Sequence, residues 1–334
     1  MTNASGAGAG EPSLDVVGDG IWLLRSPMPV VNPHEVLTYL IEDASGNLHV
    51  VDPGWSSEDA WLALEQALGT LGRSIAQIAS VTATHVHIDH FGLAARVRNA
   101  SGAAIRLGAA DIEIGRSPWS SADMDRALDA WGVPEGRRAE LRASGRGHPP
   151  QEEFPEVDAL VDGAMLPIPG RHVRALATPG HTPGHTALVV EYARVVLLGD
   201  HLLPESFPGI GLGGAEDPAP IEHYLRSLAR VVELGDVVGC PGHERVFDRV
   251  AERAVETAEH HLRRTREIAE ILADARDLSI WEVARRVTWS QGFDGLAGLR
   301  LRSALAQVGM HAEFAETAVG RRAVASGFAA FASL

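Results

Sequence analysis

The densest set of metal-binding side chains in this sequence lies in one seven-residue stretch. It reads Thr84-His85-Val86-His87-Ile88-Asp89-His90 and follows the apolar run IASV. His85 and His87 are two residues apart at the end of an extended segment, so both rings project to the same side. Asp89 and His90 follow where the chain turns into the next helix and can face a second point nearby. Nitrogen and oxygen donors of this kind suit zinc. The pattern favours a metal site over a chance cluster of histidines on a surface loop.

Further donors follow other predicted strands, each beside a glycine. Glycine lets the backbone turn sharply, so the neighbouring side chain can point to a common place above the sheet. Four segments share this arrangement: Val51-Asp52-Pro53-Gly54, Thr178-Pro179-Gly180-His181 with its repeat Thr182-Pro183-Gly184-His185, Gly199-Asp200-His201, and Pro241-Gly242-His243. We therefore expect donors from distant parts of the chain to join the 84–90 stretch.

This succession of motifs resembles the metallo-β-lactamase superfamily. HxHxDH, a later PGHTPGH, a GD step and a final PGH stand in the family's order, and the similarity covers roughly 15–245. The resemblance implies an α/β (α+β) fold built as a four-layer αββα sandwich, in which two sheets face each other, helices cover both outer sides and metals bind at one edge.

The resemblance also implies how two metal ions would be held. One ion would be bound by His85, His87 and His181, and the other by Asp89, His90 and His243. Asp200 would bridge the ions, and Asp52 would orient the ligand loop from behind. His201 directly follows Asp200 in the sequence, so it either belongs to that outer layer or lines the substrate pocket. Two divalent ions about 3.5–4 Å apart can share a water and lower its pKa, which produces a hydroxide nucleophile. Asp89 would hold that nucleophile in line, which makes it the expected catalytic residue. Two zinc ions are expected, with iron or manganese as alternatives.

Asp200 indicates which branch of the superfamily the chain resembles. True β-lactamases lack a bridging aspartate at this step, whereas glyoxalase II-like thioesterases, lactonases and phosphodiesterases carry it. The chain has no lysine, and its three tyrosines form no visible glutathione clamp. We therefore expect a hydrophobic acyl thioester or a lactone as substrate.

Two other functions stay open. A phosphodiesterase or phosphotriesterase would need cations near the metals, and Arg116, Arg137 and Arg146 could supply them. The third possibility is a persulfide dioxygenase-like enzyme with one iron, or a protein that binds without catalysis.

The elements that must position these residues follow from the apolar pattern. Helices are expected over 56–72, with Ser56 or Ser57 as cap, and over 91–102 and 220–234. Residues 110–150 form a more polar insertion with helices at 121–131 and 135–144, which is either a lid or a surface excursion. Candidate pocket walls are Phe91, Trp119, His148 and Phe207. The expected strands cover 21–26, 36–43, 47–54, 78–87, 104–108, 165–170, 172–180, 186–193, 194–200 and 236–243.

The last ninety residues have a different character. Residues 13–245 form the expected catalytic domain, and 246–334 a helical domain with helices over 249–275, 279–287, 296–308 and 311–317. The step Asp200-His201-Leu202-Leu203, together with His260, Arg264 and Ile268, resembles family members that carry a winged-helix-like tail. Residues 245–334 hold 13 Arg against 12 Asp and Glu. Such interleaved charges are typical of a solvated helical face rather than a DNA-binding surface.

Composition sets the outer limits of these predictions. The chain has 334 residues, enough for about two domains, and a net charge of −15. Residues 1–244 hold 16 Arg against 32 Asp and Glu, a balance that repels nucleic acid. No apolar run is long enough to span a bilayer, and Met1–Gly10 lacks the features of a leader peptide.

We therefore expect a cytoplasmic enzyme with a small-molecule substrate and without membrane or nucleic-acid partners. A disordered segment is expected at 1–12, and a homodimer is left open. The single cysteine, Cys240, is expected in the core.

Overall fold

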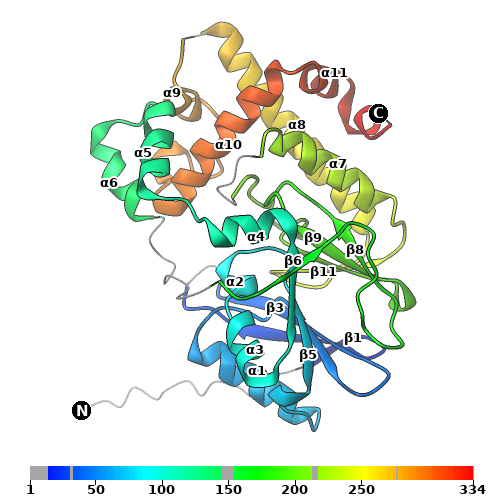
Figure 1. Cartoon of the computed structure of the whole chain (residues 1–334). Coiled ribbons are helices and arrows are strands. Elements are labelled where there is room, and N and C mark those ends of the chain that lie inside the picture. The colour runs from blue at the N-terminus through cyan, green and yellow to red at the C-terminus, as the bar shows by residue number, and fades with distance from the viewer. Residues whose placement is uncertain (1–13, 31–32, 145–153, 213–216, 276, 334) are drawn as a thin grey trace, which may run out of the picture.

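Two β-sheets packed face to face form the centre of the molecule (Figure 1). The computed structural model describes residues 14–30, 33–144, 154–212, 217–275 and 277–333. The predictions of disorder at 1–12 and of a pocket role for His148 concern residues outside these ranges.

The first sheet has seven strands in the order of the chain. The pairs from β1 to β4 are antiparallel and those from β4 to β7 are parallel. Its strands are β1 (Leu14–Gly18), β2 (Ile21–Pro27), β3 (Glu35–Glu42), β4 (Leu48–Val51), β5 (Ile78–Thr82), β6 (Ala104–Gly108) and β7 (Asp158–Leu160).

The second sheet has four strands in the order β11-β10-β9-β8, with a parallel pair at β10 and β11 and antiparallel pairs elsewhere. Its strands are β8 (Val173–Ala177), β9 (Thr186–Val190), β10 (Val195–Gly199) and β11 (Val238–Pro241). Because β8, β10 and β11 run in the same direction, their carboxyl ends lie at the same edge of the sheet.

Helices cover the outer face of each sheet. The helices are α1 (Glu58–Thr70), α2 (Ile88–Phe91), α3 (Ala94–Ser101), α4 (Ala109–Arg116), α5 (Ser121–Ala130), α6 (Glu135–Ala143), α7 (Pro220–Val232), α8 (Val250–Asp274), α9 (Ile280–Ala284), α10 (Gly298–Glu316) and α11 (Ala318–Ala332). Short 3₁₀ turns lie at Ile75–Gln77, Glu191–Ala193 and Phe293–Gly295.

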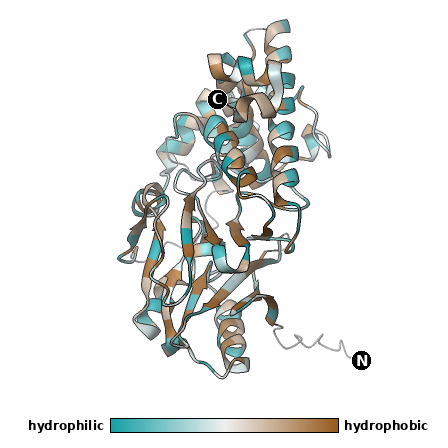
Figure 2. Cartoon of the chain, turned by 90° about the vertical axis from the view of Figure 1, so that its right-hand side faces the viewer, coloured by the Kyte–Doolittle hydropathy of each residue, from teal (hydrophilic) through white to brown (hydrophobic). Residues whose placement is uncertain are grey.

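Three apolar cores separate the four layers. One lies between the two sheets and includes Tyr39, Leu188 and Cys240, which confirms that Cys240 is a core residue. A second joins the first sheet to α1 and α3, and a third joins the second sheet to α7, α8 and α11. The four-layer αββα sandwich predicted from the sequence is therefore confirmed. In Figure 2, hydrophobic stretches run along the strands, whereas the helices at the far end alternate between hydrophobic and hydrophilic residues.

The insertion and the C-terminal region share a fourth core. Met124 and Leu128 of α5 and Leu141 of α6 pack with side chains from α8, α9 and α10. The first half of α8 meanwhile contributes to the core over the second sheet. The predicted boundary near 245 therefore does not separate two independent cores. The structure confirms helices in both regions, and the described residues after 248 form helices but no strand. A resemblance to a winged helix stays a prediction.

Several element predictions need correction. The segment 165–170 forms only an isolated bridge between Met165 and Arg174 rather than a strand. The two helices expected at 296–308 and 311–317 are one continuous helix, α10, and α11 follows it. None of the helices formed by the described residues combines the length and the apolar character needed to cross a bilayer.

Candidate metal centre

Five strands from both sheets deliver donors to one edge of the sandwich. The segments after β4, β5, β8, β10 and β11 carry them, and backbone hydrogen bonds join the sheets there. The amide of Thr186 donates to the carbonyl of Thr84 at 2.8 Å, and the amide of Leu37 donates to the carbonyl of Gly242 at 2.7 Å. These bonds make the edge a single structural unit. Its first and last contributing residues, Asp52 and His243, are 191 positions apart in the sequence.

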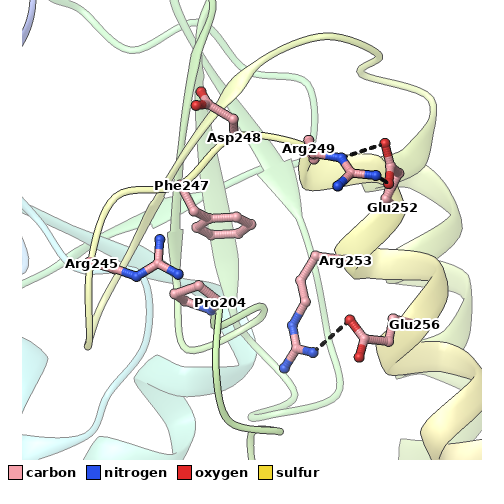
Figure 3. Close-up of a pocket in the computed structure, with 8 residues that line it drawn as sticks. All are labelled: Pro204, Arg245, Phe247, Asp248, Arg249, Glu252, Arg253 and Glu256. Carbon is pink, nitrogen blue, oxygen red and sulfur yellow. Dashed lines mark hydrogen bonds and ion pairs between the residues drawn. The ribbon is translucent and has the colours of Figure 1, made fainter.

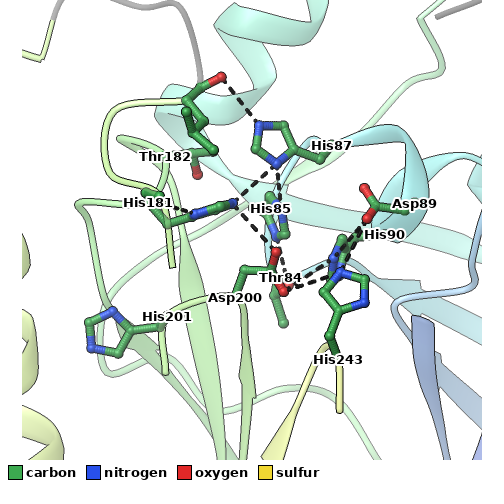
Figure 4. A network of polar contacts seen from close by, with 12 residues as sticks. Thr84, His85, His87, Asp89, His90, His181, Thr182, Asp200, His201 and His243 are labelled. Atoms are coloured by element: carbon green, nitrogen blue, oxygen red, sulfur yellow. Dashed lines mark hydrogen bonds and ion pairs between the residues drawn. The ribbon is translucent and has the colours of Figure 1, made fainter. Parts of the chain in front are cut away.

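Three histidines form the first group of donors (Figure 4). The Nδ1 atom of His87 lies 2.9 Å from Nε2 of His85 and 3.1 Å from Nε2 of His181. The donor atoms of all three lie within 4.8 Å of one another. A neutral imidazole has only one N–H group, so these three ring nitrogens cannot all form hydrogen bonds with one another. A cation bound between them would accept a lone pair from each.

Asp89, His90 and His243 form the second group. The Nε2 atom of His243 lies 3.2 Å from Oδ2 of Asp89, and that of His90 lies 3.6 Å from the same oxygen. Asp200 stands between the two groups. Its Oδ1 atom is 3.5 Å from Nε2 of His90 and 3.6 Å from Nε2 of His243, while its Oδ2 atom is 3.7 Å from Nε2 of His181. One carboxylate thus faces both groups.

The remaining ring nitrogens identify which tautomer each histidine adopts. Nδ1 of His181 donates to the carbonyl of Gly209 at 2.7 Å, and Nε2 of His87 faces the carbonyl of Leu212 at 3.3 Å. Nδ1 of His243 donates to the carbonyl of Glu35 at 2.9 Å. A carbonyl can only accept, so these nitrogens carry the hydrogen and the opposite nitrogens present lone pairs to the centre. This is the usual arrangement around metal-binding histidines.

Asp52 holds the second group from behind, in a left-handed backbone conformation with φ of 52°. One of its oxygens accepts the amide of Thr84 at 2.7 Å, and the other accepts the Thr84 hydroxyl at 2.9 Å. That second oxygen also accepts Nδ1 of His90 at 2.9 Å. The resemblance implies this orienting position for Asp52, and the carboxylate aims Nε2 of His90 at the centre.

The electrostatics of these groups favour a cation. Burial alone would lower the pKa of His90. The carboxylates of Asp89, Asp200 and Asp52 outweigh the effect of burial and raise this pKa to about 10. Burial alone would raise the pKa of Asp89, yet His90 and His243 lower it. In the first group, burial lowers the pKa of His181 to about 4, so its ring stays neutral. The second group thus collects negative charge, while the first offers uncharged lone pairs.

Unpaired buried atoms provide an independent test of the fit. Nε2 of His90 and Oδ1 of Asp200 are buried and have no hydrogen-bond partner among the described residues. Buried polar atoms are normally paired, because leaving one unsatisfied costs roughly 1–3 kcal/mol. Both atoms face the point shared by the two groups. A bound metal cation is the partner that this donor set fits.

Sequence reasoning missed one residue that assembles the centre. Asp111, at the start of α4, accepts the amide of Val86 at 2.9 Å, the hydroxyl of Thr182 at 2.8 Å and the amide of Gly184 at 2.7 Å. It therefore joins the segment that carries His87 to the loop that carries His181. No short spacing links Asp111 to these partners, so only the fold reveals the role.

Two further histidines from the same sequence segments lie behind the first donor group. His185 stacks on His85 with 5.2 Å between ring centroids, and its ring lies 5.9 Å from that of His201. Figure 4 shows His201 to one side of the donor groups. Burial lowers the pKa of His201 to about 3, so its ring stays neutral.

The prediction that Phe91 lines a pocket is wrong. Its side chain is 1% exposed in the core between the first sheet and its helices, where it stacks on Phe154. Trp119 is 46% exposed on the segment before α5. Phe207 packs on His260 and Arg253 of α8.

Comparisons with known proteins agree with this geometry. The family model described as the metallo-β-lactamase superfamily matches residues 31–243. The chain is 32% identical to a β-lactamase-like protein 2 homolog of Caenorhabditis elegans over 136 residues, 41% of this chain and 42% of that protein. It is also 32% identical to an atrochrysone carboxyl ACP thioesterase of Aspergillus fumigatus over 114 residues, 34% of each chain. The matches span well under half the length of these curated relatives.

Solved structures extend the likeness over most of the chain. A metallo-β-lactamase family protein of Thermus thermophilus is 30% identical with a TM-score of 0.71, covering 89% of this chain and 93% of that one. A β-lactamase domain protein of Burkholderia ambifaria shares the fold with a TM-score of 0.74 at 24% identity, covering 92% and 91%. With its two facing sheets and its histidine and aspartate donors in the expected order, this chain belongs to the metallo-β-lactamase superfamily, whose members are generally hydrolases.

Proposed function

We propose that this protein is a dinuclear metal hydrolase that cleaves a thioester or lactone, with zinc as the first choice of metal and iron or manganese as alternatives. The observation that carries the proposal is the convergence of five histidines and two aspartates on one edge of the sandwich, in two groups with one carboxylate between them. Superfamily membership and the thioesterase relative support hydrolysis of an acyl compound.

The ligand assignment follows from the two groups. His85, His87 and His181 would hold one ion, and Asp89, His90 and His243 the other, with Asp200 shared between them. A pair of divalent cations supplies a Lewis acid for the substrate carbonyl and lowers the pKa of a bound water.

The chain's own groups divide the remaining work. Asp52 fixes His90 from the buried side, as described above. Asp89 is 17% exposed whereas His90 is fully buried, so Asp89 lies on the accessible side of the centre. From there its carboxylate can orient the attacking water toward the substrate. The buried histidines exclude bulk water behind the reacting groups, which strengthens the electrostatic interactions at the centre.

A cysteine nucleophile is not part of this proposal. Cys240 lies in the core between the two sheets, and burial raises the pKa of its thiol. A buried neutral thiol is a poor nucleophile. Its three-residue distance from His243 is explained by its place on β11, a strand that ends at the centre.

The alternative functions receive less support from the structure. The arginines suggested for phosphate binding are engaged elsewhere, since Arg116 pairs with Glu113 and Arg137 pairs with Glu140 and the carbonyl of Leu296. Arg146 lies outside the described residues. A mononuclear iron enzyme would need only one donor group, whereas Asp89, His90 and His243 offer a second.

Metal analysis combined with a substrate panel tests the proposal. Purified protein is assayed for zinc, iron and manganese and then offered acyl-CoA and acyl-glutathione thioesters, homoserine and larger lactones, nitrocefin and bis-p-nitrophenyl phosphate. We expect about two metal ions per chain and turnover of thioesters or lactones. Chelation should remove the activity, and addition of zinc should restore it.

Different results would point to the other functions. One iron per chain with oxygen consumption would replace hydrolysis by dioxygenation. Turnover of the phosphodiester alone would keep the metals but change the substrate class. Absence of bound metal, with stability unaffected by chelator, would end the proposal.

A further inference from the structure

The segment from Leu203 to Leu212, which we call the strap, lies between β10 and α7 and runs along the first donor group. Its carbonyls at Gly209 and Leu212 accept from His181 and His87, as described above. Its backbone also pairs with the loop that carries His181. The amide of Gly211 donates to the carbonyl of Gly180 at 2.8 Å, and the amide of Leu212 donates to the carbonyl of His181 at 2.9 Å. The position of the strap therefore sets the orientation of two imidazoles.

Two charged side chains hold the other end of the strap. Glu244, the residue after His243, accepts the amides of Glu205 at 2.7 Å and of Ser206 at 3.0 Å. Arg253 of α8 donates from Nε to the carbonyl of Leu203 at 2.8 Å and from Nη2 to that of Ser206 at 2.7 Å. Glu244 thus binds two amides of the strap, and Arg253 binds two of its carbonyls.

Arg253 also fixes the aromatic residue of the strap. Its guanidinium lies 4.5 Å from the ring centre of Phe207, and that ring stacks on His260 at 3.8 Å with an interplanar angle of 10°. The Arg253 side chain is 10% exposed. Farther along, a Cβ added to Gly211 would come within 2.5 Å of the end of the Met310 side chain, so α10 packs closely against the strap at this point. The strap is therefore positioned by helices of the C-terminal region.

Arg249, the N-cap residue of α8, provides an internal contrast. Figure 3 shows Arg253 extending toward the segment of Pro204, whereas Arg249 turns back to Glu252. Each arginine forms an ion pair three positions along the chain, Arg249 with Glu252 and Arg253 with Glu256, but Arg249 is 75% exposed whereas Arg253 is largely buried. The hollow that these residues line holds three arginines with Asp248, Glu252 and Glu256, so its charges are balanced.

We propose that Arg253 is a positioning residue for the metal centre, acting through the strap on the ring orientations of His87 and His181. This inference rests on the proposed function, because it requires that these histidines bind a metal. Residues that orient metal ligands from behind typically change metal affinity by roughly 10- to 100-fold when they are replaced. Because Arg253 acts through the strap backbone, we expect an effect near the lower value.

The test compares metal affinities of Arg253→Ala, Arg253→Lys and the control Arg249→Ala in the full chain. Each protein is titrated with Zn²⁺ in competition with a chromophoric chelator, and Co²⁺ spectra report the geometry of the ligands. We expect roughly tenfold weaker binding and an altered Co²⁺ spectrum for Arg253→Ala. Lysine keeps the charge but offers one donor nitrogen in place of the two that Arg253 uses, so Arg253→Lys should lie between Arg253→Ala and the wild type. Arg249→Ala should match the wild type.

Circular dichroism and thermal melting of the metal-free proteins separate positioning from folding. A lower melting temperature for Arg253→Ala with unchanged zinc affinity and Co²⁺ spectrum would overturn the inference, and so would equal losses in Arg249→Ala. If Arg253→Ala fails to fold, Phe207→Ala replaces it, with the same expected loss of affinity. Failure of the wild-type protein itself to bind metal would refute the proposed function instead.

Discussion

Each of the five histidines that face the centre presents one ring nitrogen to it and gives the other to a partner within the fold. Three of these partners are backbone carbonyls, one is the carboxylate of Asp52 and one is the Thr84 hydroxyl. The sequence could indicate the histidines because each lies beside a glycine or within one short motif. It could not indicate carbonyl partners such as Gly209, since any residue offers a carbonyl and only the fold selects one.

Replacement of a first-group histidine should remove metal and activity together. In His87→Ala, Nε2 of His85 and of His181 lose the nitrogen that completes their group, and an incomplete ligand set binds metal poorly. We expect metal affinity to fall by more than roughly 100-fold, beyond the range seen for outer partners. Metal analysis and hydrolysis rates provide the measurement, with His172→Ala, an exposed histidine, as control. Full turnover and metal content in His87→Ala would show that the ligand assignment is wrong.

Asp89→Asn should affect rate more than folding. The amide keeps the volume of the carboxylate but loses its charge and an acceptor beside His243. We expect kcat to fall on the order of 100-fold, the lower range of what a positioned acid–base group contributes. Because Asp89 lies at the accessible side, the melting temperature of the metal-free protein should change little. An unchanged kcat at full metal occupancy would contradict the proposed orienting role.

At the scale of elements, burial explains which predictions from the sequence were accurate. The central strands are apolar and were predicted within a few residues, whereas β1 and β7 are short edge strands without a fully buried residue and were not predicted. Gly309 separates the two helices that the sequence suggests within α10, since glycine costs about 1 kcal/mol inside a helix. Buried side chains on both sides of it, including Val308 and Phe314, hold the helix continuous.

Asp111 connects helix α4 to the two loops that carry His87 and His181. Asp111→Ala would leave the Val86 and Gly184 amides and the Thr182 hydroxyl without their acceptor. We expect a loss of about 2–4 kcal/mol in the free energy of unfolding, since each unsatisfied buried group costs roughly 1–3 kcal/mol and loop relaxation recovers part of it.

Urea unfolding of the metal-free protein measures this loss. Glu113→Ala on the same helix is the matched control, because its partner Arg116 is an exposed neighbour three residues away and such pairs contribute little. If the two variants are equally stable, Asp111 does not connect the loops.

At the scale of the whole molecule, four cores are joined by helices, and one long helix serves two of them. The helix α8 packs over the second sheet with Ala254 and Leu262 and reaches the helical core with Ile268. Sequence periodicity predicts that α8 is amphipathic but not that its two halves serve different cores. The side chains between α8 and α10 include the buried His261 and His311, whose rings stack at 5.6 Å.

His311 should make stability depend on pH. Burial, followed by the charges of Arg264 and His260, lowers its pKa to about 3, against about 6.5 in an unfolded chain. Below pH 6.5 the unfolded chain therefore binds a proton that the folded protein does not. The stabilisation is complete above pH 6.5 and is lost as the pH falls from 6.5 toward 3, by about 2 kcal/mol between pH 6.5 and pH 5.

The variant His311→Gln isolates this contribution, because glutamine does not titrate and can still bond to the Thr265 hydroxyl. Its urea unfolding free energy should depend less on pH between 6.5 and 5 than that of the wild type, while the exposed His172→Gln should leave the slope unchanged. Parallel slopes for wild type and His311→Gln would contradict a depressed pKa at this site.

The helical core shared by the insertion and the C-terminal region has a consequence for synthesis of the protein. Leu128 and Leu141 leave the ribosome well before their partners Leu301 and Leu305 exist. At roughly 5–20 residues per second, the gap of about 125 residues between α6 and the first helical partner at Ile268 corresponds to about 6–25 s. During that interval the apolar side chains of α5 and α6 have only one another to pack against, because the rest of their core has not been made. Translation speed between the codons for α6 and those for α10, and chaperones that shield such surfaces, should therefore influence the yield of correctly assembled protein.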